Sequence, residues 1–194
     1  IGTPLIRNLG TVGGNIVNAS PAADTYPPLL VYDARVKLLS RRGERTVALK
    51  DFAVDVKKTV IKPDELLTEI HIPLKAMGMA STWARIGKRN ANVLSIVSGA
   101  AAVEVDDEVC VDVRIALGAV ASTPILAEHA ADYLRGKKPT QDDVETVGEI
   151  ASNEARPITD FRASREYRLE MIKVLTKRVV WSAVEQAKMK RVNR

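Results

Sequence analysis

The feature that most constrains this chain is a stretch near its beginning, from Arg7 to Asp24, that has almost no side-chain bulk. Its sequence, RNLGTVGGNIVNASPAAD, holds three glycines, three asparagines and two small hydroxyl residues. Glycine has no Cβ and also adopts positive φ, so the backbone here is open to close approach by a ligand. Consecutive N–H groups in such a loop form an anion-binding concavity, to which Thr11, Asn15 and Ser20 add side-chain donors. The Asp24 carboxylate could accept hydrogen bonds from hydroxyl or ring N–H groups.

The stretch is typical of a loop that binds phosphate or a nucleotide, but its spacing fits neither common pattern. It lacks the G-x-x-x-x-G-K-[ST] of the P-loop and the G-x-G-x-x-G of dinucleotide-binding folds. A purely structural interpretation is a Gly-Gly turn followed by the start of a helix, and spacing alone favours it. Asp24 is then the N-cap of a short helix over residues 24–33, with the prolines in its first turn.

Composition argues against several other kinds of site. The single cysteine, Cys110, excludes an intramolecular disulfide and a cluster of cysteine ligands, and it favours a reducing, cytoplasmic setting. The two histidines, His71 and His129, form no H-E-x-x-H pattern, so we expect no histidine metal site. No apolar run approaches the roughly 18–20 residues that span a bilayer. The net charge of +5 is spread along a chain with 4% aromatic residues, so we do not expect nucleic-acid binding.

Residues 1–75 show the pattern of a small β structure after the glycine-containing stretch. Partial alternation around Gly43 predicts a hairpin of residues 35–41 and 45–49. A loop follows to Pro63, and residues 66–72 then predict a strand that ends at Pro73. In this strand His71 lies on the opposite alternating set from Leu66 and its partners, so we interpret it as a surface residue.

Residues 76–194 change pattern and predict three strands followed by three helices. The strands are expected at residues 81–88, 96–105 and 109–119. In the third, Val111 lies on the alternating buried set and Cys110 on the less buried face. The helices are expected at 125–135, at 141–154 after a capping box of Thr140 and Asp143, and at 164–190. This order is typical of an α+β unit with its helices on one face of an antiparallel sheet.

Four segments occur in an order that identifies a family. They are T-V-G-G-N with S-P-A-A-D, the strand E-L-L-T-E-I-H-I-P, the aromatic-x-basic strand that begins Trp83-Ala84-Arg85, and Ser164-Arg165-Glu166-Tyr167-Arg168. Together they resemble the FAD-binding (medium) subunit of the molybdenum hydroxylases, which include xanthine dehydrogenase and aerobic carbon monoxide dehydrogenase. The resemblance implies the C-terminal part of a PCMH-type FAD-binding domain over residues 1–75. A C-terminal flavoprotein subdomain, a three-stranded antiparallel sheet with three helices, follows over residues 76–194.

The resemblance also implies how FAD is held, with no catalytic residue and no metal ligand in this chain. The diphosphate and adenosine side would contact the glycine-containing stretch, Asp24 would bind ribityl or ribose hydroxyls, and Arg85 would lie near the flavin ring. Arg85 stands where lysine is usual in the family, and arginine cannot lend a proton. The implied cofactor-binding residues are Thr11, Gly13, Gly14, Asn15, Asn18, Asp24, Leu67 and Arg85.

The family places an earlier Gly-rich loop on the other side of the pyrophosphate, in a preceding subdomain. The chain begins at Ile1 without a methionine, so we interpret it as part of a longer or split subunit that lacks this N-terminal FAD-binding segment. The implied function is to pass electrons through FAD to an acceptor, in a complex with a molybdenum-cofactor subunit and a [2Fe-2S] subunit. The alternative is a flavin-free partial subunit that serves as an assembly or docking module.

Overall fold

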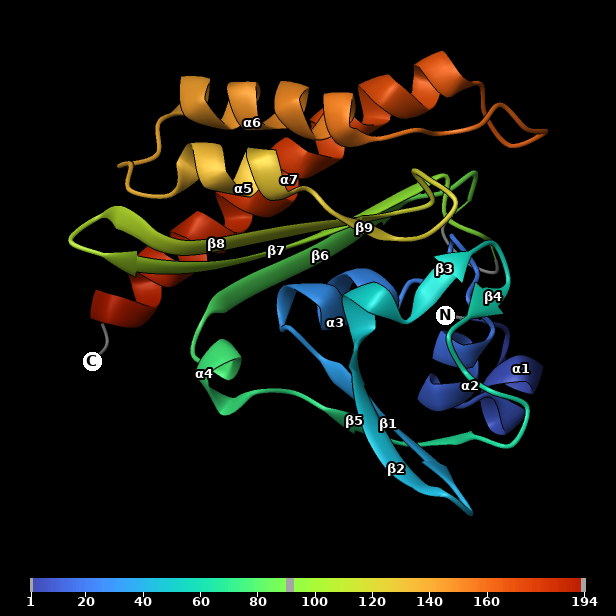
Figure 1. The fold of residues 1–194 in the computed structure, drawn as a ribbon. Helices are drawn as coiled ribbons and strands as arrows, with labels where there is room; N and C mark the ends of the chain where they lie inside the picture. The colour runs from blue at the N-terminus through green and yellow to red at the C-terminus, as the bar shows by residue number, and fades with distance from the viewer. Residues whose placement is uncertain (1, 90–92, 193–194) are drawn as a thin grey trace.

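The structure, a computed structural model, describes residues 2–89 and 93–192. Its centre is a four-stranded antiparallel sheet in the order β6-β7-β8-β9. Figure 1 shows three helices, α5, α6 and α7, on one face of this sheet and the N-terminal part of the chain, with α3 nearest, on the other face. The α+β class is therefore confirmed, with a short fourth strand added to the three that were predicted.

The N-terminal part contains short helices and two small sheets. The predicted hairpin and the predicted strand before Pro73 form one three-stranded sheet in the order β2-β1-β5. The segment predicted as a loop up to Pro63 contains a two-stranded sheet, β3-β4. The elements are α1 (Pro4–Leu9), α2 (Val12–Val17), α3 (Tyr26–Val31), β1 (Arg35–Ser40), β2 (Gly43–Ala48), a 3-10 turn (Leu49–Asp51), β3 (Ala53–Asp55), β4 (Lys58–Thr59), β5 (Leu66–His71) and α4 (Leu74–Met77).

The C-terminal part follows the predicted order of strands and helices. The elements are β6 (Ala80–Ile86), β7 (Val97–Asp106), β8 (Val109–Gly118), β9 (Ile125–Leu126), α5 (Glu128–Leu134), α6 (Gln141–Glu154) and α7 (Arg165–Val192). The capping box at the start of α6 is present, with Thr140 and Asp143 each accepting a backbone N–H of the other. The helix predicted from residue 125 was wrong at its start, because Ile125 and Leu126 pair with Leu117 and Ala116 of β8.

Both faces of the central sheet are buried, and their residues differ in size. On the helix side, branched residues of β7 and β8 such as Val103, Val113 and Ile115 pack against α5, α6 and α7. On the other side Ala100, Ala102 and Ala116 belong to the core of the N-terminal part. These small side chains allow α3 to lie close to the strands. The three C-terminal helices lie on one face of the sheet, as predicted, and the N-terminal part covers the other.

Gly118 at the end of β8 lies where the N-terminal part packs tightly on the central sheet. A Cβ there would lie 2.5 Å from Ser98 Oγ and 3.1 Å from Pro27 Cγ. We expect Gly118→Ala to lower the free energy of unfolding by about 2 kcal/mol, because overpacking forces neighbours to shift. Chemical denaturation measures this loss. Gly99→Ala is the matched control, since a Cβ there makes ordinary contacts at 3.5 Å with Leu117 and Leu175.

A second substitution tests whether the contact with Ser98 causes the loss of stability in the Gly118→Ala variant. Within the described residues, Ser98 Oγ is buried and makes no hydrogen bond. Ser98→Ala in the Gly118→Ala background should therefore recover part of the lost stability. Equal stability of the Gly118→Ala and Gly99→Ala variants would contradict the close approach.

Two β-bulges change which residues face the core. Glu104 and Val105 of β7 pair with Asp112 and Cys110 of β8, so Val111 is the extra residue in β8. Cys110 consequently faces the helices and is fully buried, whereas Val111 is 48% exposed, the reverse of the prediction. Burial raises the pKa of the Cys110 thiol to about 11.

The second bulge is in β5. Lys37 pairs with Glu69 and Leu38 with Leu67, so Thr68 is the extra residue. Leu67 therefore shares the core-facing side with Ile70, and Leu66 is 71% exposed. His71 is an exposed strand residue, as predicted, and its Nε2 lies 2.8 Å from Glu69 Oε2.

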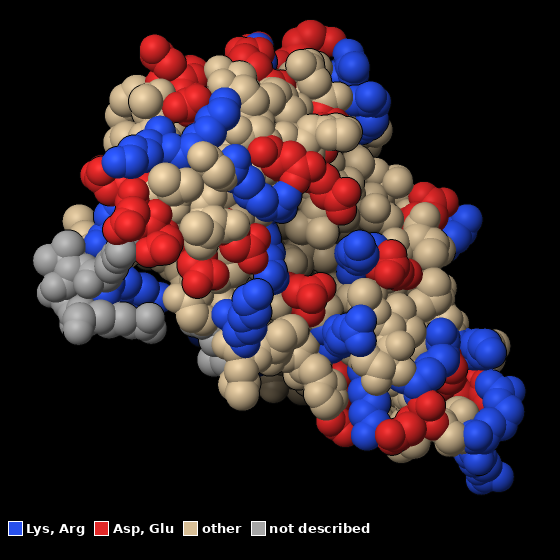
Figure 2. All heavy atoms as spheres, turned by 60° about the vertical axis from the view of Figure 1, so that its left-hand side comes forward, with Lys and Arg blue, Asp and Glu red and all other residues tan. Residues whose placement is uncertain are grey.

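Charged side chains of both signs cover the face shown in Figure 2, with Lys and Arg interspersed among Asp and Glu. Ion pairs also join α7 to α6, such as Lys177 with Glu145 and Lys173 with Glu149. Among the described residues, no helix has both the length and the apolar character needed to cross a membrane.

Candidate functional site

The residues around the Gly-Gly pair form the start of a helix, not an irregular loop. Thr11 is the N-cap of α2, and its Oγ1 accepts the N–H of Gly14 at 2.9 Å. Gly13 and Gly14 are helical, so the positive φ suggested by their residue type is absent at both positions. Their contribution is the missing Cβ, which leaves the first helical turn accessible. The N–H groups of a first turn have no acceptor within their own helix and favour anions.

A cavity of about 600 Å³ lies along this helix start. It brings together Thr11, Gly14, Asn15 and Asn18 of the predicted set. Hydrogen bonds orient both amides, since Asn15 Oδ1 accepts from Thr25 Oγ1 at 2.6 Å and Asn18 Oδ1 accepts from Lys57 Nζ at 2.7 Å. The remaining residues that line the cavity are Ile6, Arg7, Leu9, Gly10, Val12 and Thr25.

A second cavity, of about 480 Å³, adjoins the first at Val12 and Thr25, which line both. Its walls are Pro28 and Leu29 of α3 and Trp83 of β6, together with Asp24 and Arg85. Asp24 and Arg85 are far apart in the sequence, yet Arg85 Nη1 donates to Asp24 Oδ2 at 2.8 Å. The pairing follows from α3 packing on the sheet that contains β6.

Asp24 is held from both sides of its carboxylate. Its side chain is 6% exposed, and Ser95 Oγ donates to Oδ1 at 2.6 Å opposite the bond from Arg85. The predicted N-cap role was wrong, because Thr25 occupies the cap position of α3 and makes no side-chain cap bond. Each carboxylate oxygen carries a further lone pair, so Asp24 can still accept from a ligand at the cavity wall.

Sequence reasoning missed the segment that supports this ion pair. Residues 93–96, between β6 and β7, supply Ser95 to Asp24 and the Val93 carbonyl to Arg85 at 3.2 Å. Arg168 of α7 donates to the carbonyl of the next residue, Ile96. The Ser164–Arg168 motif did mark Arg168, but nothing in its local pattern indicates so distant an acceptor.

Arg168 is 2% exposed and joins three segments. Besides Ile96, its Nη1 reaches the Ala119 carbonyl at 3.2 Å, and its Nη2 donates to Asp160 Oδ1 at 2.8 Å. The end of β8, the segment before β7 and the loop before α7 therefore meet at one guanidinium.

Two of the predicted residues lie outside both cavities. A Cβ at Gly13 would lie 3.5 Å from Leu67 Cδ2, so Gly13 rests on Leu67 of β5. Neither residue lines the cavities, and their position supports α2 from its core side. Contact of Leu67 with a cofactor stays a prediction.

The two adjoining cavities fit an extended cofactor with a polar part and a flat apolar part. The cavity at α2 borders the first turn of that helix, where Gly14 leaves the backbone without a Cβ, and a helix start suits a diphosphate. At Gly14 a Cβ would lie 3.0 Å from Thr11 Oγ1, so a side chain there would crowd the capping bond. The second cavity is mostly apolar with one carboxylate and one guanidinium, a composition typical of a site for a heteroaromatic ligand.

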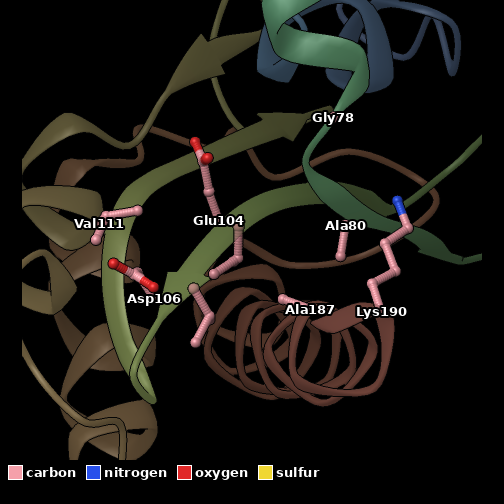
Figure 3. Close-up of a pocket in the computed structure, with 9 residues that line it drawn as sticks. Gly78, Ala80, Glu104, Asp106, Val111, Ala187 and Lys190 are labelled. Carbon is pink, nitrogen blue, oxygen red and sulfur yellow. The ribbon is translucent and has the colours of Figure 1, made fainter. Parts of the chain in front are cut away.

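A further cavity, of about 450 Å³, lies at the other end of the strands, where β6 begins. Figure 3 shows Glu104 and Asp106 of β7 on one side of it and Lys190 of α7 on the other. All three side chains are exposed, and Lys190 Nζ donates to the Met79 carbonyl at 3.0 Å. Within the described residues, no group of acidic, cysteine or histidine side chains could hold a metal ion.

Comparison with known proteins gives matches along nearly the whole chain. Residues 1–75 match the family described as the FAD binding domain in molybdopterin dehydrogenase, and residues 82–183 match the CO dehydrogenase flavoprotein C-terminal domain. The xanthine dehydrogenase FAD-binding subunit of Escherichia coli O157:H7 is 33% identical over 188 residues, which are 96% of this chain and 64% of that protein. The carbon monoxide dehydrogenase medium chain of Afipia carboxidovorans is 32% identical over 97% of this chain and 65% of its own length.

Solved structures match over a similar share of the chain. A chain of the Cu,Mo-CO dehydrogenase superposes with a TM-score of 0.90 at 31% identity, over 96% of this chain and 65% of that one. A chain of quinoline 2-oxidoreductase from Pseudomonas putida 86 gives a TM-score of 0.89 at 29% identity, over 96% and 65% of the two chains. The chain thus spans somewhat less than two thirds of the length of these relatives.

Proposed function

The chain belongs to the flavoprotein family that joins the FAD binding domain of molybdopterin dehydrogenases to the CO dehydrogenase flavoprotein C-terminal domain, and we propose that it is the FAD-binding component of such an oxidoreductase. FAD, the cofactor expected from the sequence, is the cofactor of the family that residues 1–75 match. The observation that carries the proposal is the Asp24–Arg85 ion pair in the wall of an apolar cavity that adjoins the accessible start of α2.

In this proposal the two cavities bind different parts of the cofactor. The first turn of α2 binds the diphosphate: Thr11 and Gly14 line the cavity, and Gly13, which does not, contributes its backbone N–H from the same turn. The amides of Asn15 and Asn18 add donors beside it. The carboxylate of Asp24 accepts from hydroxyl groups of the ribityl or ribose part.

Arg85 is proposed to lie against the ring of the flavin. Its guanidinium keeps its positive charge at all ordinary pH values, so it favours negative charge on a neighbouring group but provides no proton. The bound FAD would supply the electron-transfer chemistry, and the protein orients it and sets the charge around it.

The larger assembly is also part of the proposal. Electrons would come from iron–sulfur clusters of a [2Fe-2S] subunit that receives them from a molybdenum-cofactor subunit, in the cytoplasm. Residues 1–75 and 76–194 would form the second part of the FAD-binding domain and the C-terminal subdomain. Support comes from relatives named as FAD-binding or medium chains of xanthine and carbon monoxide dehydrogenases.

The visible spectrum of the purified chain tests the proposal. The chain is incubated with FAD, desalted and scanned, and we expect a flavin band that stays with the protein and is bleached by dithionite. The Asp64→Ala variant should retain the same flavin band, because Asp64 lies in an exposed ion pair with Arg42 and lines neither cavity. A colourless protein after desalting, with no saturable spectral change on titration with FAD, would overturn the proposal and favour the flavin-free docking module.

A further inference from the structure

We propose that Trp83 stacks on the isoalloxazine ring of FAD and forms the aromatic wall of the site. The inference rests on the proposed function, since it assigns a residue and an orientation within the same cavity. Three observations carry it: the face of β6 on which Trp83 lies, the space beside it, and the polar groups at the end of the cavity.

Trp83 lies on the cavity side of β6, the edge strand of the central sheet. Successive residues of a strand point to opposite faces. Thr82 makes a hydrogen bond to Ser182 of α7 at 3.2 Å, and Ala84 packs against the core under the helices. Trp83 and Arg85 face the other way and line the cavity together.

The indole of Trp83 is available to a ligand. Its residue is 38% exposed, and within the described residues it belongs to neither hydrophobic core cluster. The residue opposite it on β7 is Ala100, whose small side chain is buried. A large aromatic side chain that is partly exposed and lines an apolar cavity is placed to stack on a flat ring.

The walls facing Trp83 are also apolar. Pro28 and Leu29 of α3 and Val12 of α2 complete the cavity, whose volume is about 480 Å³. A diphosphate would be poorly placed here, because Arg85, the cation of this cavity, is already paired with Asp24, whose carboxylate would repel a second anion. The cavity therefore suits a ring system, with the diphosphate next to it at α2.

The polar groups favour the isoalloxazine ring over adenine. The guanidinium of Arg85 can only donate hydrogen bonds. The pyrimidine edge of isoalloxazine carries two carbonyl acceptors, whereas the corresponding edge of adenine carries an amino group that also donates. Since Arg85 and Trp83 are two residues apart on the same face of β6, a ring stacked on the indole presents its edge to the guanidinium.

Emission of the bound flavin tests the contact. An indole stacked on isoalloxazine quenches flavin emission by electron transfer at contact distance, and phenylalanine does not. We expect FAD bound to the unaltered chain to be dark and FAD bound to the Trp83→Phe variant to be bright. The matched control is Trp181→Phe, since Trp181 is the other tryptophan and packs on the helix side of the sheet; its bound flavin should stay dark.

Binding of the two halves of the cofactor tests the orientation. We expect Trp83→Ala to weaken the affinity for riboflavin and for FAD by about tenfold and to leave the affinity for ADP unchanged. Circular dichroism and the thermal midpoint confirm that each variant is folded. A Trp83→Phe variant whose bound flavin stays dark, or a Trp83→Ala variant that loses ADP in place of riboflavin, would overturn the inference while FAD binding itself persists. Absence of FAD binding to the unaltered chain would instead overturn the proposed function.

Discussion

Replacement of Asp24 by alanine is expected to abolish retention of FAD and to lower the free energy of unfolding by about 3 kcal/mol. The substitution leaves the guanidinium of Arg85, whose side chain is 22% exposed, without its carboxylate. It also leaves Ser95 Oγ buried without an acceptor. Desalting after incubation with FAD measures the first effect, and chemical denaturation measures the second.

The exposed Arg42–Asp64 pair is the control for Asp24. Its atoms are 2.9 Å apart, close to the 2.8 Å of Arg85 and Asp24, but the two side chains are 63% and 47% exposed. Asp64→Ala should therefore cost less than about 1 kcal/mol and leave FAD retention unchanged. Ser95→Ala removes one hydrogen bond to Asp24 and should cost about 1 kcal/mol. Equal stability losses for Asp24→Ala and Asp64→Ala would show that burial of the first pair has no energetic importance.

Arg168→Met is expected to have the largest effect on stability, about 4 kcal/mol. It leaves the carbonyls of Ile96 and Ala119 without this donor and leaves Asp160 without its buried cation. Arg168→Lys should recover only part of the loss, because a single ammonium does not reproduce the planar fork that reaches three acceptors. Denaturant titration of both variants measures the difference.

Arg165, the first residue of α7, provides the matched control. It is exposed, and Arg165→Met should change the free energy of unfolding by less than about 0.5 kcal/mol. If Arg168→Met is no less stable than Arg165→Met, the junction at Arg168 does not hold the fold together.

The partner of Arg168 adds a pH dependence that can be checked in the same titrations. Burial raises the pKa of Asp160, but the bonds from the Arg162 N–H and from Arg168 outweigh it and hold the pKa below its usual value. A carboxyl with a lowered pKa in the folded state contributes stability above its unfolded pKa, about 3.9, and loses it as the pH falls through the folded value. Asp160→Asn should make the unfolding free energy less sensitive to pH in this acid range.

The sequence predicted those features that depend on neighbouring residues. The start of α6 follows from Thr140 and Asp143, because a capping box uses only residues within one helical turn. The strand alternation that ends at Leu117 likewise predicts β8. Both signals are local, so they do not depend on how distant parts of the chain pack.

The features that were mistaken depend on the pairing of distant strands. A β-bulge inserts one residue and reverses the alternation beyond it, so the patterns at Val111 and Thr68 gave the wrong faces. The glycines of α2 were interpreted as turn residues, because nothing next to them indicates that Thr11 caps a helix there.

The ion pair at the site lies between these two cases. Asp24 and Arg85 were both predicted as cofactor residues from the resemblance, but their bond to each other depends on how α3 packs on the central sheet. Ser95 and Ile96 carry no local signal at all, since their roles are to meet Asp24 and the distant Arg168.

The bulge at Val111 makes Cys110 a natural probe of the separation of the helices from the central sheet. The bulge places Cys110, the only cysteine of the chain, in the interior beneath the helices, where burial raises the pKa of the thiol to about 11. A thiol reagent reacts with the thiolate, which forms at an ordinary rate only after the helices separate from the sheet. The rate at which Cys110 is alkylated under native conditions therefore measures how often this layer comes apart, without any engineered label.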